Sequence, residues 1–324
     1  MSYVELFSKT TPNKSLLGGK GSNLIKLFNL GIKTPLGFIV NTNSYTKFLK
    51  ESHLKDELDL LLKKTYAPNE VLELSNKIND FFIDSEVPKV ITEEIKRVFS
   101  QHNEQFGERV SFAVRSSANI EDSKDFSFAG QAESYLCNKT FNEIILSMKK
   151  CWASLFSPQA LLYFLQMRRS GKKVNLKDLK MAVIVQKMVN PQVSGVLFTS
   201  NVINNDLNQM VINSTWGLGE TITNNTVIPD LIILKKEKFE VLKIELGDKQ
   251  KMLIPNPEGS FTLLVETDPE SKRICSLNDH QLLQLHKIGS ILEKMFEYPQ
   301  DIEWAIENDE IYILQSRPIT TLKN

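Results

Sequence analysis

Helix-forming and strand-forming segments come in separate blocks along this chain, and that order restricts the fold more than any other feature. Apolar residues recur with helical spacing at about 43–64, 68–83 and 88–105. The stretch from 110 to 250 is richer in short β-rich runs bounded by turn residues. Because helices and strands do not alternate regularly, the sequence predicts an α+β fold with at least two lobes.

These segments suggest a division into lobes. An N-terminal α/β lobe is expected at 1–110, and lobes that complete the fold at 111–324, with a helical insertion at about 140–180. A last helix is expected at about 278–297, whereas the stretch near 248–276 is polar and carries no predicted strand. The predicted strands are Gly37–Val40, Val110–Val114, Met181–Lys187, Gly195–Ser200, Gln209–Asn213, Leu231–Leu234, Val241–Leu246, 301–306 and 311–316.

Charge and composition exclude several classes of protein. Lysine plus arginine equals aspartate plus glutamate, 39 each, which argues against a general binder of nucleic acid or of membrane surfaces. The apolar runs are too short to span a bilayer, and the N-terminus lacks the pattern of a signal peptide. The three cysteines are scattered and have no metal-like spacing, so a reduced, cytoplasmic location is expected.

A glycine-rich segment, GGKGSN at 18–23, precedes an apolar helical pattern. Glycines let the backbone approach a phosphate closely, and a helix N-terminus offers free N–H groups and a partial positive charge. Lys20 adds a point charge for an anionic oxygen. The segment is not a Walker A sequence, and the alternative is a glycine turn before a helix with a solvated lysine.

An arginine next to two hydroxyls, in AVRSSA at 113–118, is expected at a strand end. Arg115 in that position suits bidentate binding of phosphate. The small-residue loop SFAGQAES at 127–134 follows, and Gly130 lets it fold over a nucleotide because glycine tolerates unusual dihedral angles. The alternative is a surface salt bridge and an ordinary hairpin loop.

A possible adenine contact lies at the end of the predicted strand Met181–Lys187. Where a strand runs into a linker, its backbone N–H and C=O groups are able to face the edge of an adenine ring. Gln186 adds an amide, and Met188 adds an adaptable apolar surface. The alternative is an ordinary strand end.

Two polar pairs are predicted to meet on a hairpin at 301–317. Residues i and i+2 share a face of a strand, so Asp301 lies with Glu303 and Gln315 lies with Arg317. If the faces coincide, a carboxylate and an amide oxygen become available to Mg²⁺, a hard cation that prefers oxygen ligands. Arg317 beside them suits phosphate charge. The alternative is an edge hairpin with a surface ion pair, which contributes little to stability.

The length of the loop decides whether the polar faces coincide. A two-residue loop would place Glu303 opposite Leu314 and separate the polar pairs. A three-residue loop, Asn308–Glu310, is predicted instead, because the register must keep the apolar residues together. The cross-strand pairs that it implies are Asp301 with Arg317, Glu303 with Gln315, Trp304 with Leu314 and Ile306 with Tyr312.

Eight motifs, taken in order, resemble those of one protein family. They are LGGKGSNL, AVRSSANIEDSKDFSFAGQAES, CWASLF, MAVIVQKMV, VSGVLFTSN, INSTWGLGE, PD and DIEWAI…LQSRP. This order, over roughly 16–320, resembles the ATP-binding domain of phosphoenolpyruvate synthase, pyruvate phosphate dikinase and rifampin phosphotransferase. The resemblance implies an ATP-grasp-like fold in which two lobes clamp ATP and Mg²⁺.

The resemblance also implies a role for each matching residue. The residues are Lys20 and Arg115 for the phosphates, Gly130, Gln131 and Ser134 for the loop that covers them, Gln186 and the Met188 backbone for adenine, Glu303 and Gln315 for Mg²⁺ with Asp301 nearby, and Arg317 for charge on the transferred group. Lys20, Arg115 and Arg317 are the catalytic candidates. Phosphoryl transfer depends mainly on such positioning and charge neutralisation.

Complete members of the family carry a swivelling domain with a phosphorylatable histidine in a Gly-Gly-x-Thr-x-His setting. None of the four histidines, His53, His102, His280 and His286, lies in that setting. We therefore expect an ATP-dependent phosphotransferase domain of dikinase type, with its histidine domain on another chain or in a missing C-terminal region. The alternatives are a stand-alone ATP-grasp kinase or ligase that acts on a small acceptor, and a non-catalytic ATP-binding regulatory module.

Overall fold

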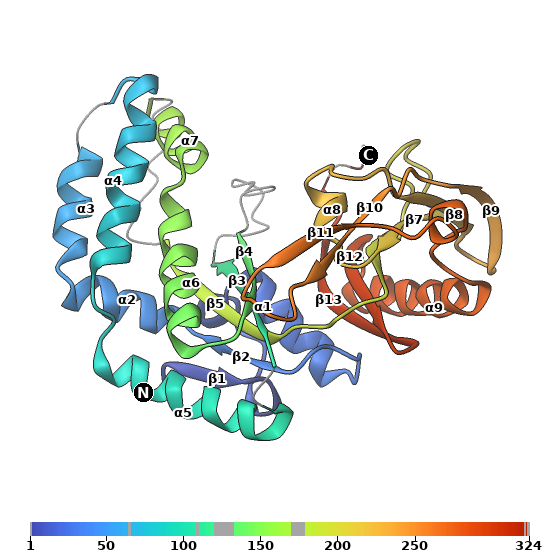
Figure 1. The fold of residues 1–324 in the computed structure, drawn as a ribbon. Coiled ribbons are helices and arrows are strands. Elements are labelled where there is room, and N and C mark those ends of the chain that lie inside the picture. Colours follow the sequence, from blue (N-terminus) through green and yellow to red (C-terminus); the bar gives the residue numbers. More distant parts are fainter. Residues whose placement is uncertain are drawn as a thin grey trace. The chain divides into compact units, whose positions relative to one another are not determined.

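Helices and antiparallel strands are both abundant in the computed structural model (Figure 1), which describes residues 2–63, 66–107, 110–119, 133–169, 179–320 and 322. The α+β class predicted from the sequence is therefore confirmed. The chain divides into two compact units, residues 1–29 with 36–188 and residues 30–35 with 189–324. Within the described ranges, no helix has the length and apolar character needed to cross a membrane.

The first unit contains a five-stranded antiparallel sheet in the order β1-β2-β5-β3-β4. Its strands are β1 (Val4–Leu6), β2 (Gly37–Val40), β3 (Phe112–Ala118), β4 (Ser134–Asn138) and β5 (Met181–Lys187). Its α-helices are α1 (Lys14–Asn29), α2 (Thr42–Glu51), α3 (Leu54–Lys63), α4 (Val71–Asp84), α5 (Lys89–Phe106), α6 (Phe141–Ala153) and α7 (Pro158–Arg169).

The boundary between the compact units falls after Met188, whereas the sequence analysis divided the chain at residue 110. Strand β3, which follows residue 110, pairs with β5, and β5 pairs with β2. Residues on both sides of 110 therefore build one sheet. Helices α6 and α7 occupy the described part of the stretch predicted as a helical insertion, and α6 packs on this sheet.

Two apolar cores lie on opposite faces of the five-stranded sheet. On β5, Val183 and Val185 belong to the larger core, whereas Ala182 and Ile184 belong to the smaller. This separation follows from the two-residue repeat of a strand. Helices α2 to α7 contribute to the larger core, and α1 contributes to the smaller. Each face of β5 is therefore covered, which explains why its sequence is a continuous apolar run.

Helix α1 is interrupted at Gly18, which has a φ of 73° and a ψ of 178°. A β-carbon at this position would lie 2.1 Å from the carbonyl oxygen of Ser117. Glycine is therefore required twice, for the left-handed φ and for the close approach to β3. The second helical piece of α1 begins directly after this turn.

Gly18→Ala is expected to destabilise the fold more than Gly31→Ala does. The two glycines have nearly equal φ values, 73° and 74°, so each alanine carries backbone strain of at least about 1 kcal/mol, and the extended ψ of 178° at Gly18 adds to the strain there. At Gly18 the new methyl group also meets the backbone, whereas at Gly31 nothing described lies within 4 Å. Urea denaturation should give losses of about 2–4 kcal/mol for Gly18→Ala and about 1 kcal/mol for Gly31→Ala. Equal losses would contradict the close approach at Gly18.

The second unit contains a six-stranded antiparallel sheet in the order β13-β12-β6-β7-β8-β9. Its strands are β6 (Val193–Phe198), β7 (Gln209–Trp216), β8 (Asp230–Lys235), β9 (Glu240–Glu245), β12 (Gln300–Glu307) and β13 (Glu310–Pro318). The α-helices are α8 (Glu220–Thr223) and α9 (Asp279–Phe296). Helix α9 packs on one face of the sheet, where Gly289 lies against Leu197 and Met210.

Two strands lie in the stretch near 248–276, where the sequence analysis predicted none. They are β10 (Lys251–Pro255) and β11 (Thr262–Glu266), which pair with each other as a two-stranded antiparallel sheet. An isolated bridge joins Leu253 of β10 to Gly217. Neither strand has a buried residue, so the alternation that marks a half-buried strand is weak here.

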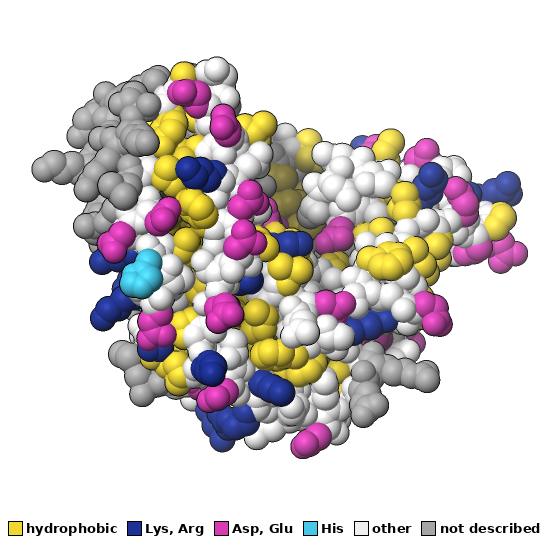
Figure 2. Space-filling view, turned by 60° about the vertical axis from the view of Figure 1, so that its left-hand side comes forward, with side chains coloured by type: hydrophobic (Ala, Val, Ile, Leu, Met, Phe, Trp, Pro, Cys, Tyr) yellow, Lys and Arg dark blue, Asp and Glu magenta, His cyan; other side chains and the backbone are white. Residues whose placement is uncertain are grey.

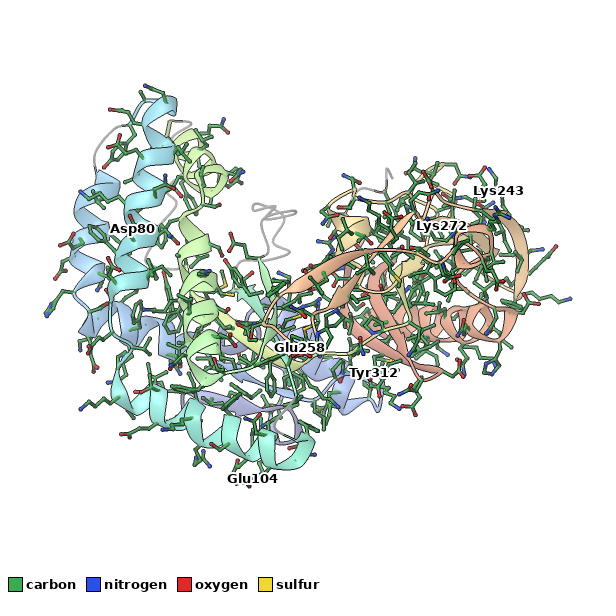
Figure 3. All side chains as sticks on the ribbon, viewed as in Figure 1. Asp80, Glu104, Lys243, Glu258, Lys272 and Tyr312 are labelled. Atoms are coloured by element: carbon green, nitrogen blue, oxygen red, sulfur yellow. The ribbon has the colours of Figure 1, made fainter. Side chains whose placement is uncertain are left out.

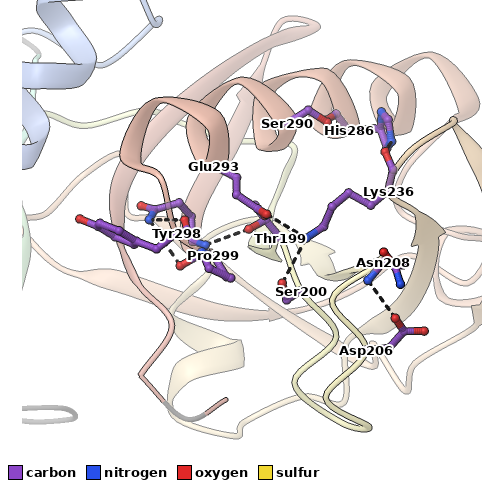
Figure 4. A network of polar contacts seen from close by, with 11 residues as sticks. Thr199, Ser200, Asp206, Asn208, Lys236, His286, Ser290, Glu293, Tyr298 and Pro299 are labelled. Carbon is purple, nitrogen blue, oxygen red and sulfur yellow. Dashed lines mark hydrogen bonds and ion pairs between the residues drawn. The ribbon is translucent and has the colours of Figure 1, made fainter. Parts of the chain in front are cut away.

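A polar network attaches α9 to the ends of neighbouring strands (Figure 4). Lys236 Nζ donates to Glu293 Oε1 at 3.0 Å and to Ser200 Oγ at 3.2 Å. The backbone N–H of Gln300 donates to Thr199 Oγ1 at 2.8 Å. These contacts anchor the start of β12 and the C-terminal part of α9 at one end of the sheet.

Charged side chains of both signs are distributed over the surface. On the face shown in Figure 2, basic and acidic side chains are interspersed, in agreement with the balanced composition. On the edge strand β9, Lys243 (Figure 3) pairs with Glu245 at 2.5 Å. Charges on an exposed edge discourage pairing with another chain.

Candidate functional site

In the first unit, one sheet face brings together four of the predicted site residues. Arg115 on β3 lies opposite Ser134 on β4, and Gln186 is two residues beyond Ile184, which belongs to the core under α1. Because residues i and i+2 share a face, Arg115, Ser134 and Gln186 lie on the α1 side of the sheet. Lys20 is in α1 and reaches the same strand β3. Gly130 and Gln131 lie outside the described residues.

Lys20 is nearly buried, with 8 % of its surface exposed. Its Nζ donates to the carbonyl oxygen of Ser116 at 3.3 Å. The backbone N–H of Gly21 donates to Ser117 Oγ at 2.9 Å. The expectation that the helix start offers free N–H groups to a phosphate is therefore wrong for Gly21, because a serine of β3 already accepts that hydrogen bond.

The two residues proposed to contact adenine differ in their surroundings. Gln186 is buried, with 2 % of its surface exposed. The backbone N–H of Met188 donates to the Ser111 carbonyl at 2.8 Å, and Met188 Sδ accepts from the Cys137 N–H at 2.9 Å. An adenine contact through the Met188 backbone therefore depends on its carbonyl oxygen.

A buried thiol lies on the opposite face of the first sheet from Lys20. Cys151 of α6 is fully buried, and its Sγ is 4.0 Å from the Val114 carbonyl oxygen on β3. Burial raises the pKa of this thiol, and the positive charge of Lys20 opposes that increase. A thiol held protonated in this way is a poor nucleophile, so we assign it a packing role only.

In the second unit, the hairpin of β12 and β13 has the predicted polar pairs but a different loop. Asp301 is opposite Arg317 and Glu303 is opposite Gln315, as predicted. The loop has only two residues, Asn308 and Asp309, with φ values of 52° and 60°. Positive φ at both positions is typical of a type I′ turn, which suits the twist of a hairpin.

A β-bulge reconciles this short loop with the polar register. The register shifts between Glu303 and Trp304, so that Trp304 pairs with Ile313 and Ile306 pairs with Ile311. The three-residue loop and the predicted pairs of Trp304 with Leu314 and of Ile306 with Tyr312 are therefore wrong. The extra residue of the bulge, Leu314, shifts the pairing by one position, so that Glu303 again faces Gln315. A third loop residue would have had the same effect on this pair.

Asp301 and Arg317 form an ion pair across the hairpin. Arg317 Nε and Nη2 each lie 2.8 Å from Asp301 Oδ2. The side chain of Asp301 is 12 % exposed and that of Arg317 is 41 % exposed. The carboxylate is therefore largely buried while the guanidinium reaches solvent, and this geometry orients Arg317.

The stability contributed by Asp301 is expected to fall as the pH rises. Burial raises the pKa of Asp301 above its usual 3.8, although the charge of Arg317 lowers it. The folded state then keeps this proton to a higher pH than the unfolded chain does, so ionisation costs stability between the unfolded and folded pKa values. Relative to Asp301→Asn, the wild type should therefore lose unfolding free energy as the pH rises through that window. Urea titrations of both proteins at several pH values check this, and the opposite trend would show that the Arg317 pair outweighs burial.

Glu303 and Gln315 offer oxygen atoms suited to a hard cation. Gln315 is only 7 % exposed, and its side-chain amide makes no hydrogen bond with any described residue. The amide atoms of Gln315 are not among the buried, unpaired polar atoms of the described residues, so they keep contact with solvent and are accessible to a ligand. Among the described residues no group of three or more His, Cys, Asp or Glu is placed to hold a metal. Mg²⁺ does not need one, because it is often held by one or two carboxylates together with substrate phosphates.

Asn213, which was not predicted from the sequence, shares a sheet face with Glu303. Val196 of β6 lies between them, opposite Glu303 on one side and opposite Asn213 on the other. Asn213 is half-buried, and in the described structure its side-chain amide makes no hydrogen bond. Two strand spacings separate it from Glu303, roughly 10 Å. No local signal marks Asn213, because its proximity arises from the order β12-β6-β7.

Comparison with known proteins identifies relatives along nearly the whole chain. Residues 14–324 match the family described as pyruvate phosphate dikinase, AMP/ATP-binding domain. The chain is 35 % identical to a phosphoenolpyruvate synthase of Pyrococcus furiosus, over 99 % of this chain and 44 % of that protein. It is 36 % identical to a rifampicin phosphotransferase of Bacillus subtilis, over 95 % of this chain and 34 % of that protein.

The matched share of the relatives is smaller than the matched share of this chain. A probable phosphoenolpyruvate synthase of Methanocaldococcus jannaschii is 36 % identical, and the match covers 95 % of this chain but 26 % of that protein. The chain thus spans less than half the length of these relatives. Because the family match covers almost every residue, the chain belongs to the family of pyruvate phosphate dikinase AMP/ATP-binding domains.

Proposed function

We propose that this chain is an ATP-dependent phosphotransferase domain that binds Mg-ATP and passes a phosphoryl or pyrophosphoryl group to a histidine elsewhere. The observation that carries the proposal is the sorting of polar residues onto sheet faces in a chain of this family. Lys20, Arg115 and Gln186 gather at one face of the first sheet. Glu303 and Gln315 meet on one face of the second.

In the first unit, the proposed role of Lys20 and Arg115 is to neutralise phosphate charge. Arg115 is a residue of β3, and the side chain of Lys20 donates a hydrogen bond to a carbonyl oxygen of the same strand. Ser134, opposite Arg115, is the last residue of the proposed phosphate-covering loop at 127–134. Gln186, with the Met188 carbonyl, is proposed to read adenine. Fixed charges of this kind stabilise a transferring phosphoryl group without reorganisation.

In the second unit, Glu303 and Gln315 are proposed to hold Mg²⁺, which would neutralise charge on the phosphate oxygens when bound. Arg317, oriented by Asp301, is proposed to stabilise charge on the transferred group. Asn213 is an additional candidate contact, because its amide lies on the face that carries Glu303.

The proposal also covers the fold of the nucleotide domain and the domain that receives the phosphoryl group. An ATP-grasp-like fold is proposed for the nucleotide domain, and a swivelling histidine domain for the partner. The greater length of the relatives, one of which is named a phosphoenolpyruvate synthase and another a rifampicin phosphotransferase, supports the existence of further domains in the family. A cytoplasmic location is part of the proposal.

The test is a product analysis by ³¹P NMR. The chain is incubated with Mg-ATP alone and together with a separately expressed histidine-bearing domain of this family. AMP and phosphate that appear only with the added domain would support the proposal. ADP from the chain alone would favour a direct kinase or ligase, and tight ATP binding without turnover in either mixture would favour a regulatory module.

The assignment of Lys20 is tested with a matched pair of variants. Lys20→Ala is expected to fold normally and to lose turnover in the same assay. Lys26→Ala removes an exposed lysine from the same helix and should leave turnover unchanged. Equal activity of the two variants would disprove the role of Lys20.

A further inference from the structure

We propose that Ser117 is a positioning residue, whose hydroxyl holds the glycine-rich turn of α1 against β3 and thereby sets the position of Lys20. The inference rests on the proposed function, in which Lys20 contacts the phosphates of ATP. Ser117 itself is fully buried and is not proposed to touch the nucleotide.

The hydroxyl of Ser117 contacts both ends of the turn. Its Oγ accepts a hydrogen bond from the Gly21 N–H at 2.9 Å and donates one to the Leu17 carbonyl oxygen at 2.8 Å. A serine hydroxyl has one proton to donate and lone pairs to accept, so one side chain closes the turn from both sides. The bond to Gly21 also caps the first turn of the second helical piece, a role that a helix usually fills with a residue of its own chain segment.

The turn has little freedom to move around this contact. At Gly18, a β-carbon would lie 2.1 Å from the Ser117 carbonyl oxygen. At Gly21, a β-carbon would lie 3.1 Å from the side chain of Ile39. The two glycines therefore let the turn approach β3 closely, and the hydroxyl of Ser117 fixes where along the strand it rests.

Lys20 lies inside this turn, between the two anchored residues. Its Nζ donates to the carbonyl oxygen of Ser116 at 3.3 Å. The backbone on either side of Lys20 is thus held by Ser117, and its ammonium group is held by the preceding residue of the same strand. An ammonium group has three protons to donate, so the bond to Ser116 is compatible with a phosphate contact.

The same strand carries the other proposed phosphate-binding cation. Arg115 and Ser117 are two residues apart on β3 and share a face. Like charges repel, so the fold has to hold Lys20 and Arg115 in place. The hydrogen bonds of Ser117 contribute to this, because they tie the turn that carries Lys20 to the strand that carries Arg115.

A double-mutant cycle tests whether Ser117 acts through Lys20. The dissociation constant of Mg-ATP is measured by titration, up to millimolar nucleotide, for the wild-type chain, Ser117→Ala, Lys20→Ala and the double variant. In the chain that retains Lys20, Ser117→Ala is expected to weaken ATP binding about tenfold. In the Lys20→Ala background the same change should weaken binding less than twofold, since the residue that it positions is gone.

Two further variants separate positioning from loss of stability. Ser44→Ala removes another fully buried serine hydroxyl, which donates to the Tyr3 carbonyl at 2.9 Å, and should leave ATP affinity unchanged. Ser117→Cys keeps the shape with a weaker hydrogen-bonding group, and its loss of affinity should lie between those of the wild type and Ser117→Ala. If Ser117→Ala does not fold, the cycle is run with Ser117→Cys.

The outcomes distinguish this inference from the proposed function. Equal losses from the Ser117 change in both backgrounds, or no loss in either, would overturn the positioning role while leaving Lys20 as a phosphate contact. Normal binding and turnover by Lys20→Ala would overturn the proposed role of Lys20, and the inference with it.

Discussion

Replacing Glu303 by alanine is expected to abolish nucleotide turnover while leaving the fold intact. Glu303 lies in the middle of β12, half-buried and opposite Gln315. The variant removes the only carboxylate of the proposed metal pair, and with it the charge that would hold a divalent cation beside the phosphates. A loss on the order of 10³-fold in turnover is expected, because metal neutralisation of phosphate charge cannot be replaced by Gln315 alone.

The matched control for this prediction is Glu245→Ala. Glu245 is exposed on edge strand β9 of the same sheet, and its ion pair with Lys243 is of the surface type that contributes little. Turnover with Mg-ATP is followed for both variants together with far-UV circular dichroism. A folded Glu303→Ala protein with wild-type turnover would disprove the metal site on this hairpin.

Replacing Asp230 by alanine is expected to cause the largest loss of stability in the second unit. Asp230 and Lys249 form an ion pair in which neither side chain is exposed. Asp230 also accepts hydrogen bonds from the Gly247 N–H at 2.9 Å and from the N–H and hydroxyl of Ser276, each at 2.8 Å. Removing the carboxylate leaves a buried ammonium group and three donors without their acceptor, which is expected to cost about 3–5 kcal/mol.

The comparison with Lys249→Met makes this prediction specific. Lys249→Met leaves Asp230 with the donors of Gly247 and Ser276, so it should be less destabilising than Asp230→Ala. The double variant should recover part of the loss of Asp230→Ala, because it removes the unpaired buried ammonium. Urea denaturation gives the three free energies, and a larger loss for Lys249→Met would contradict this account.

The strands with a strong apolar character were predictable from the sequence. Gly37–Val40 and Met181–Lys187 have the predicted bounds, and a strand pairs on each side of Met181–Lys187. Such strands can be recognised from the sequence as continuous apolar runs, because both of their faces are buried. The polar pairs of the last hairpin were also predictable, since a two-residue repeat is a property of any strand.

Where local periodicity was weak or a register changed, the prediction failed. The hairpin of β10 and β11 has no buried residue, so no alternation marked it. The bulge between Glu303 and Trp304 has no sequence signal of its own. The polar pairs were therefore predicted correctly although the predicted loop was one residue too long. Both cases depend on how the neighbouring strands pack, which a single segment does not contain.

By itself the sequence determined the α+β class, the family motifs and which residue types are available for phosphate, metal and adenine. Tertiary structure alone decided which of them meet. Ser117 and Gly21 are 96 residues apart in the chain, yet they form the hydrogen bond that holds the turn of Lys20. Asn213 joins the face of Glu303 only through an intervening strand. The physical reason is that periodicity encodes which face of an element is buried, whereas the contacts between elements follow from strand order, close packing and the pairing of buried polar groups.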